Sequence, residues 1–113
     1  FLQMYLNQGV YNGKRLLSRT TVNVILANQI GDLWGENASR AYGLAFAVQT
    51  QKGENDGGSG SIGTFSWGGY FNTQYFADPK EQIIGIILKQ TQGPVSDKTG
   101  WKFPILVAQS IDD

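Results

Sequence analysis

The chain has 113 residues, with nine basic and nine acidic residues and a formal net charge of zero. Nucleic-acid and anionic-membrane binders usually carry a basic surface, so we expect neither partner. Cysteine and histidine are both absent, which excludes disulfides and thiolate nucleophiles and removes the usual zinc ligands and the commonest general base. We therefore expect no metal site and no cofactor. Every apolar run is shorter than the roughly 20 residues of a bilayer span, so we expect no membrane span.

The first forty residues are expected to be mainly helical. Apolar residues at i, i+4 spacing predict a helix over residues 1–8 that stops at Gly9. This helix starts on an apolar residue without a cap, as the later part of a longer helix does, so we expect the chain to be a fragment. Asn12-Gly13 predicts a tight hairpin turn, and Ser18 is expected to cap a second helix that ends near Gln29.

Three less regular segments follow. Residues 32–41 lack periodicity and predict a loop pinned by the buried indole of Trp34. Residues 42–48 alternate large and very small side chains, which predicts a strand whose small face meets a close neighbour. Residues 51–63 are polar and rich in glycine, which is typical of a flexible loop and not of a packed element.

The last part of the chain predicts a sheet and a terminal helix. Strands are expected over residues 62–67, 71–77 and 82–90, with the turn Asp78-Pro79 making the last two an antiparallel hairpin. Gly85 interrupts a β-branched run and is expected to admit a close neighbour.

Residues 105–111 suit a helix that covers the sheet, and Pro104 is expected in its first turn. The predicted fold class is α+β, with an antiparallel sheet of about three to five strands packed against a C-terminal helix and N-terminal helices. We expect residues 1–113 to form one unit, in which residues 1–41 are the helical part and connection and residues 42–113 are the sheet and last helix.

Two adjacent glycines lie inside an aromatic run, Ser66-Trp67-Gly68-Gly69-Tyr70. Glycine packs nothing and loses the most backbone entropy in a strand, so a specific backbone need is expected here. One interpretation is a bulge among ordinary packed aromatics. The other is a strand edge that a ligand must approach closely.

Several short sequence motifs, taken in order, resemble the C-terminal portion of the serine β-lactamase and penicillin-binding-protein superfamily. The resemblance is strongest to the class C β-lactamases and related esterases. The motifs are Phe1-Leu2-Gln3-Met4, Lys14-Arg15-Leu16-Leu17-Ser18, Tyr42-Gly43-Leu44-Ala45-Phe46, Trp67-Gly68-Gly69 and Asp78-Pro79-Lys80-Glu81. The resemblance implies a bacterial serine hydrolase that acts on an ester, amide or peptide by acyl transfer. It also implies a periplasmic or secreted location, which the residues alone do not give.

The family carries three sequence boxes, and the first, Ser-x-x-Lys, is absent here because no lysine has a serine three residues before it. The resemblance therefore implies that the nucleophile lies outside this chain and that the fragment alone is inactive. The second box has two literal matches, Tyr5-Leu6-Asn7 and Tyr70-Phe71-Asn72. We interpret both as chance.

The third box has two candidates. Lys98-Thr99-Gly100 matches it literally but leads into a predicted helix, whereas Trp67-Gly68-Gly69 is followed by another strand and a proline-containing turn, as in the family. We favour the second and interpret the first as a helix start. The resemblance then implies that Trp67, Gly68 and Gly69 bind substrate and that the Tyr70 N–H forms part of the oxyanion hole. Trp67 replaces the family's lysine, so β-lactam turnover is not implied.

A non-catalytic alternative remains open. Trp67, Tyr70, Tyr75 and Phe76 predict an aromatic platform for carbohydrate or peptide if their side chains are exposed together. A second expectation concerns association, because a sheet completed by strands from outside the chain keeps an open edge that invites pairing between copies.

Overall fold

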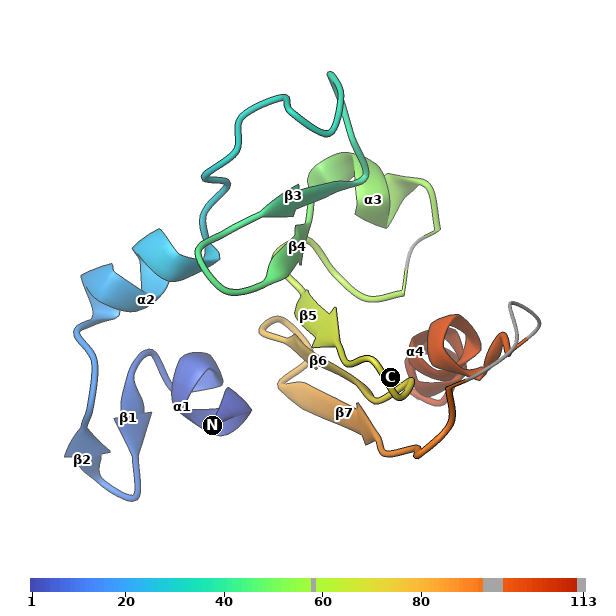
Figure 1. Ribbon diagram of the computed structural model, residues 1–113. Coiled ribbons are helices and arrows are strands. Elements are labelled where there is room, and N and C mark those ends of the chain that lie inside the picture. Colours follow the sequence, from blue (N-terminus) through green and yellow to red (C-terminus); the bar gives the residue numbers. More distant parts are fainter. Residues whose placement is uncertain (58, 93–96, 112–113) are drawn as a thin grey trace.

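The computed structural model describes residues 1–57, 59–92 and 97–111, and in these ranges it combines helices with two antiparallel sheets (Figure 1). The elements are, in chain order, α1 (Leu2–Leu6), β1 (Val10–Tyr11), β2 (Lys14–Arg15), α2 (Arg19–Leu26), β3 (Arg40–Tyr42), β4 (Ala47–Gln49), α3 (Gln51–Asn55), β5 (Phe65–Gly68), β6 (Gln74–Asp78), β7 (Ile83–Ile87) and α4 (Thr99–Gln109). The first two strands form a small hairpin, and the other five form the main sheet.

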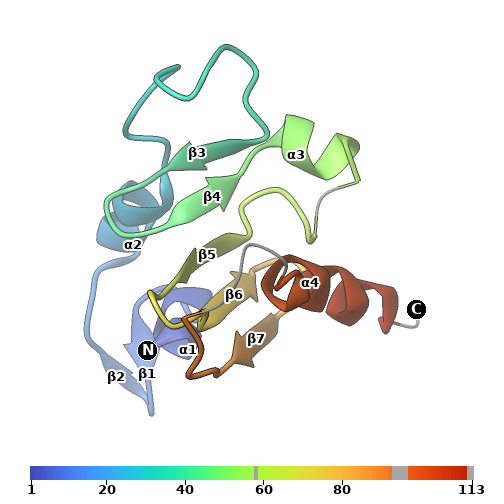
Figure 2. The same ribbon diagram turned by 45° about the vertical axis from the view of Figure 1, so that its right-hand side comes forward.

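The main sheet has the strand order β3-β4-β5-β6-β7, with each strand antiparallel to the next. Helix α4 lies against one side of it, and α1 with the small hairpin lies on the other side (Figures 1 and 2). The α+β class, a five-stranded antiparallel sheet and the packed C-terminal helix confirm the fold predicted from the sequence.

Two apolar layers flank the sheet because neighbouring residues of a strand point to opposite faces. On the α1 side, the rings of Phe46 and Phe65 lie 5.1 Å apart, and the ring of Tyr5 on α1 lies 5.1 Å from that of Phe46. On the α4 side, Phe76 places its ring 6.0 Å from that of Phe103. The buried core cluster belongs to the α1 side and contains Leu2, Met4, Tyr5, Leu6, Val22, Phe46, Val48, Phe65 and Ala77.

The local turn and cap signals are confirmed. Asn12 and Gly13 have φ of 48° and 74°, as the tight turn between β1 and β2 requires. The Thr21 N–H donates to the Ser18 side chain at 3.0 Å, so Ser18 caps α2. Helix α2 ends at Leu26, three residues before the predicted end near Gln29.

The prediction of one strand over residues 42–48 is wrong. The segment is a bend between β3 and β4, and the Gly43 N–H donates to the Phe46 carbonyl at 2.8 Å. The reason is tertiary: Gly43 lies against the end of α2, where a Cβ would overlap the Ile25 carbonyl. The small residue does meet a close neighbour, as expected, but at a bend and not on a strand face.

Three further expectations need correction. The glycine-rich segment contains helix α3, because the Thr50 side chain accepts a hydrogen bond from the Gly53 N–H at 3.2 Å and caps it. Trp34 is half-exposed and so does not pin its loop as a buried indole. Pro104 is the sixth residue of α4 and not part of its first turn.

The three predicted strands of the last part are present as β5, β6 and β7, with β6 and β7 paired as an antiparallel hairpin. Gly85 does admit a close neighbour, since a Cβ there would overlap the ring of Phe76. Among the helices in the described ranges, none has both the length and the apolar character needed to cross a bilayer.

Candidate active site

The strand end that carries the predicted third box extends beyond its neighbour. β5 pairs with β4 only through Phe65 and Ser66, whereas it pairs with β6 along its whole length, from Phe65 to Gly68. Trp67 and Gly68 therefore have a strand on one side and an open edge on the other. The sheet thus offers, at this point, a stretch of backbone that another molecule can approach.

Backbone hydrogen bonds determine the directions in which the amides at this end of β5 point. The Gly69 N–H donates to the Thr73 carbonyl at 2.8 Å, toward β6. Alternate residues of an antiparallel ladder face opposite neighbours, which turns the Gly68 backbone groups toward the open edge. Tyr70 follows inside a turn that the Asn72 N–H and the Gly69 carbonyl close at 3.1 Å, and no described residue accepts a hydrogen bond from the Tyr70 N–H. Among the described residues, that amide is therefore a donor without an acceptor, beside an open strand edge.

The two glycines have a structural reason in addition to any functional one. A Cβ on Gly69 would overlap the Thr73 hydroxyl, and a Cβ on Gly68 would lie 3.2 Å from the Thr73 carbonyl oxygen. Both residues are exposed. The hairpin tip therefore favours glycine by itself, and the absence of side chains also leaves the backbone open from solvent.

Aromatic side chains border the strand end on one side. The rings of Trp67 and Tyr42 lie 5.0 Å apart, and those of Tyr42 and Trp34 lie 5.7 Å apart, all edge to face. Trp67 is 47% exposed, so half of the indole is available to a bound molecule. Burial, together with the neighbouring Tyr42 and Tyr5, raises the pKa of Tyr75.

The predicted aromatic platform is not assembled as expected. Phe76 is only 6% exposed and packs beneath α4, and Tyr75 is half-buried on the opposite face of β6. Tyr70 is 74% exposed and packs against Phe71 instead, with ring centroids 5.2 Å apart. The four rings thus do not form one surface.

The segment after β7 holds the turn that contains Tyr70 in place. The sequence did not predict this contact. The Asn72 side-chain amide donates to the Thr91 carbonyl at 2.9 Å, the Thr91 N–H donates to the Phe71 carbonyl at 3.3 Å, and Gln92 hydrogen-bonds the Tyr70 hydroxyl. Asn72 thus tethers the turn to the segment after β7. Contacts between residues this far apart in sequence cannot be predicted from patterns of neighbouring residues.

The rejected tripeptide Lys98-Thr99-Gly100 lies at the start of α4 and is not part of a strand, although Gly100 packs against the Gln74 side chain of β6. Asp97 accepts hydrogen bonds from the Thr99 N–H at 3.0 Å and from the Lys89 ammonium at 2.7 Å. The bond from Lys89, with those from Thr99, holds the pKa of the Asp97 carboxyl well below its usual range. These contacts describe a helix start.

Across the described ranges, no three His, Cys, Asp or Glu side chains gather as metal ligands would. The chemistry available at the strand end is therefore that of backbone donors, hydroxyls and aromatic walls. Backbone N–H groups at this edge, among them that of Tyr70, can donate to an oxygen that gains negative charge.

No protein-family model matches the chain. Two curated proteins of Mycobacterium tuberculosis, Protein Rv1367c of strain ATCC 25618 / H37Rv and the uncharacterized protein MT1414 of strain CDC 1551 / Oshkosh, are each 30% identical to it over 100 residues. The match covers 80% of this chain and 25% of each relative, so the chain spans about a quarter of their length.

Among solved structures, the chain is similar to EstCE1, a hydrolase with promiscuous acyltransferase activity. The TM-score is 0.67 at 20% sequence identity, and the match covers 95% of this chain and 27% of that one. The chain therefore has the fold of one part of a larger hydrolase structure.

Proposed function

We propose that this chain is the C-terminal part of a serine hydrolase related to the β-lactamases and penicillin-binding proteins, which cleaves an ester, amide or peptide by acyl transfer. The observation that carries the proposal is the Tyr70 N–H, a donor without an acceptor among the described residues, beside the open edge of β5. The fold shared with part of EstCE1, a hydrolase with acyltransferase activity, supports it.

In the proposed mechanism a serine from outside these 113 residues attacks the substrate carbonyl, whose oxygen becomes an oxyanion. A donor about 2.7–3.1 Å from that oxygen stabilises the charge as it develops. The Tyr70 amide supplies one such donor at no cost in reorganisation, because the turn that contains it is tied to Thr91 through Asn72. Gly68 and Gly69 leave the approach clear.

Trp67 is expected to set the substrate preference of the site. The family's third box begins with lysine, whereas Trp67 places an uncharged, half-exposed indole against Tyr42. An indole binds apolar or aromatic groups and offers no cation to a substrate carboxylate. We therefore expect neutral esters or amides to be better substrates than β-lactams.

The proposal also covers the organisation of the chain. We propose that residues 1–113 form one unit with the rest of a longer protein, and that copies associate through exposed sheet edges when those edges are not covered. β7 is one such edge, and Ile86 on it is exposed. Light scattering over a range of concentrations tests this point, and a strictly monomeric profile contradicts it.

The test of function uses the intact protein that carries this chain. Incubation with a fluorophosphonate probe and then peptide mapping is expected to find one labelled serine outside residues 1–113, and p-nitrophenyl acetate is expected to be hydrolysed. The 113 residues alone are expected to be neither labelled nor active. Turnover of the ester by the isolated chain contradicts the proposed division of the site.

The second candidate is a binding module without catalysis. The observation in its favour is the row Trp34, Tyr42 and Trp67, in which the two indoles are half-exposed. Exposed aromatic surfaces of this kind suit sugar rings and peptide side chains. Saturable glycan or peptide binding by an intact protein that the probe does not label favours this candidate over the hydrolase.

A further inference from the structure

Two aromatic side chains meet beside the open edge of β5. Tyr42 on β3 pairs with Ala47 on β4, and Ala47 pairs with Ser66 on β5, so these residues form one row across three strands. Trp67 is the next residue of β5 and lies beyond the point where β4 begins. The rings of Trp67 and Tyr42 are 5.0 Å apart. The edge that carries Gly68 therefore has an aromatic wall beside it.

Trp34 extends this wall from the loop before β3. Its indole lies 5.7 Å from the Tyr42 ring, edge to face. The Gln29 N–H donates to the Tyr42 carbonyl at 2.8 Å, which fixes the start of the loop. The Thr50 hydroxyl donates to the Ala38 carbonyl at 2.8 Å, which fixes its end. The fold thus holds both ends of the loop that carries Trp34.

The two outer rings of this row are exposed. Trp34 is 50% exposed and Trp67 is 47% exposed, whereas the core rings of Phe46 and Phe65 are almost fully buried. An aromatic side chain stabilises a fold through the apolar surface that it removes from water. Half of each indole makes no such contribution within the described ranges and is left for a partner from outside them.

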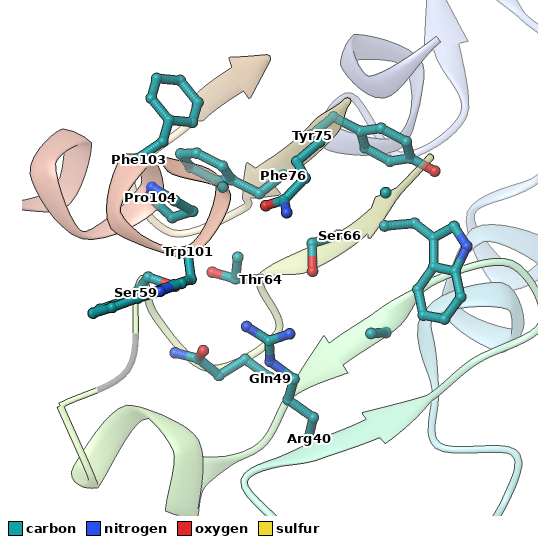
Figure 3. Close-up of a pocket in the computed structure, with 15 residues that line it drawn as sticks. Arg40, Gln49, Ser59, Thr64, Ser66, Tyr75, Phe76, Trp101, Phe103 and Pro104 are labelled. Carbon is teal, nitrogen blue, oxygen red and sulfur yellow. The ribbon is translucent and has the colours of Figure 1, made fainter. Parts of the chain in front are cut away.

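A hollow of about 250 Å³ also borders Trp67, on the side of α4. Figure 3 shows polar side chains on its strand side, among them Arg40, Gln49 and Ser66, and the indole of Trp101 on its helix side. An aryl group placed there would cover polar groups and separate them from water, which costs free energy. The row of rings is therefore the better match for an aryl group.

We propose that Trp34, Tyr42 and Trp67 determine substrate choice in the proposed hydrolase, and that they bind an aryl group of a neutral ester. The inference rests on the proposed function, because it names the substrate class of that same site. Aromatic pairs gain from edge-to-face and offset contacts beyond the area they bury, and a saturated group of the same size does not. The aryl group continues the series of ring contacts while the carbonyl oxygen accepts from the Tyr70 N–H.

The test compares four esters on the intact protein by pH-stat titration, which needs no chromogenic leaving group. Methyl phenylacetate and benzyl acetate are isomers that carry the ring on the acyl side and on the alcohol side. Methyl cyclohexylacetate and cyclohexylmethyl acetate are their saturated counterparts. Each kcat/KM is divided by the hydroxide-catalysed rate constant of the same ester, which removes differences in intrinsic reactivity. The aryl ester of at least one pair is expected to be preferred about tenfold.

The outcomes separate this inference from the proposed function. Turnover with equal normalised kcat/KM in both pairs overturns the inference and leaves the proposed hydrolase in place. No turnover of any ester, together with no serine labelled by the fluorophosphonate probe, contradicts the hydrolase and the inference with it.

Matched variants locate the aryl group. Trp34→Leu and Trp101→Leu each replace an indole that is about half-exposed. Trp34→Leu is expected to lower the aryl-over-saturated ratio about fivefold, and Trp34→Phe to keep part of it because a ring remains. Trp101→Leu is expected to leave the ratio unchanged. An unchanged ratio in Trp34→Leu overturns the assignment, and so does a ratio lost in Trp101→Leu alone, which places the aryl group in the hollow.

The ratio also separates binding from folding. Both rates of a pair are measured on the same preparation, so a smaller folded fraction lowers both and cancels in the ratio. If Trp34 acts only in the fold, its variants are expected to lower the denaturation midpoint and both rates together. That result, with the aryl-over-saturated ratio unchanged, overturns the role of Trp34 in substrate choice.

Discussion

The carboxylate of Asp78 accepts a hydrogen bond from the Ser61 N–H at 2.8 Å, across seventeen residues of sequence. The same carboxylate accepts from the N–H groups of Lys80 at 2.9 Å and Glu81 at 3.2 Å. Asp78 is 3% exposed. One buried side chain therefore joins the loop before β5 to the turn after β6, and it fixes the end of this strand pair that lies opposite the tip with Gly68 and Tyr70.

Asp78→Asn is expected to lower the free energy of unfolding by roughly 1–3 kcal/mol, because charge-assisted hydrogen bonds from three backbone amides to the buried carboxylate are lost or weakened. Urea denaturation at pH 7 measures the loss. The matched control is Asp56→Asn, which changes an exposed carboxylate paired with Lys52 and is expected to have little effect. Equal stability of Asp78→Asn and the unmodified protein at pH 7 contradicts the role of Asp78.

The pH dependence of this contribution has a definite sign. Burial by itself would raise the pKa of Asp78, but the hydrogen bonds from Ser61, Glu81 and Lys80 outweigh it and lower the pKa below its ordinary value. The stabilisation is therefore present above the unfolded pKa of about 4 and is lost as the pH falls through the lower folded pKa. The stability difference between Asp78→Asn and the unmodified protein is expected to shrink in urea denaturation experiments as the pH falls below the unfolded pKa of about 4.

Gly85→Ala is expected to destabilise the fold by about 1–3 kcal/mol, because the added methyl group overlaps the ring of Phe76. Phe76→Ala removes that ring and also lowers stability by leaving a cavity. In the double variant the clash is absent, so the two losses are expected to sum to more than the measured total. Additive losses in chemical denaturation contradict the contact as the cause.

The features that could be predicted from the sequence are those set by neighbouring residues. The turn at Asn12-Gly13 and the cap at Ser18 depend on backbone angles and side chains within three residues, and both are present. The bend at Gly43 depends on the Ile25 carbonyl of another element, which no local pattern contains, so the alternation there was mistaken for one strand.

The features of the candidate site fall into the same two groups, those that could be predicted from neighbouring residues and those that could not. The glycine pair and its place at the end of a strand could be predicted, because Gly68 and Gly69 stand out in an aromatic run and a turn signal follows. The tether of Asn72 to Thr91 could not, because it joins residues nineteen positions apart in the sequence. Only the completed sheet brings them together.

Ser18→Ala is expected to cost about 1 kcal/mol, because the Thr21 N–H at the start of α2 loses its acceptor. Ser18→Asp is expected to restore most of the loss, since aspartate caps equally well. Thermal unfolding followed by far-ultraviolet circular dichroism measures both. An alanine variant as stable as the unmodified protein contradicts the contribution of the cap.

Gly69→Val tests the proposed active site most directly. If the Tyr70 amide faces an oxyanion, a branched side chain next to it blocks the approach and is expected to lower kcat/KM of the intact protein about 100-fold or more. The structure also gives the substitution a cost in folding, because a Cβ on Gly69 meets the Thr73 hydroxyl. A loss of activity alone therefore does not separate access from stability.

The Thr73→Ala background makes that separation, because it removes the hydroxyl that a Gly69 side chain meets and leaves the strand edge and the Tyr70 amide in place. In this background the denaturation midpoint of Gly69→Val is expected to recover toward that of Thr73→Ala alone, while kcat/KM for p-nitrophenyl acetate stays low. Recovery of activity together with stability identifies Gly69 as a residue of the hairpin fold and contradicts its role in substrate access. Low activity at restored stability places the bound acyl group against the open edge of β5, where the Tyr70 N–H has no other acceptor among the described residues.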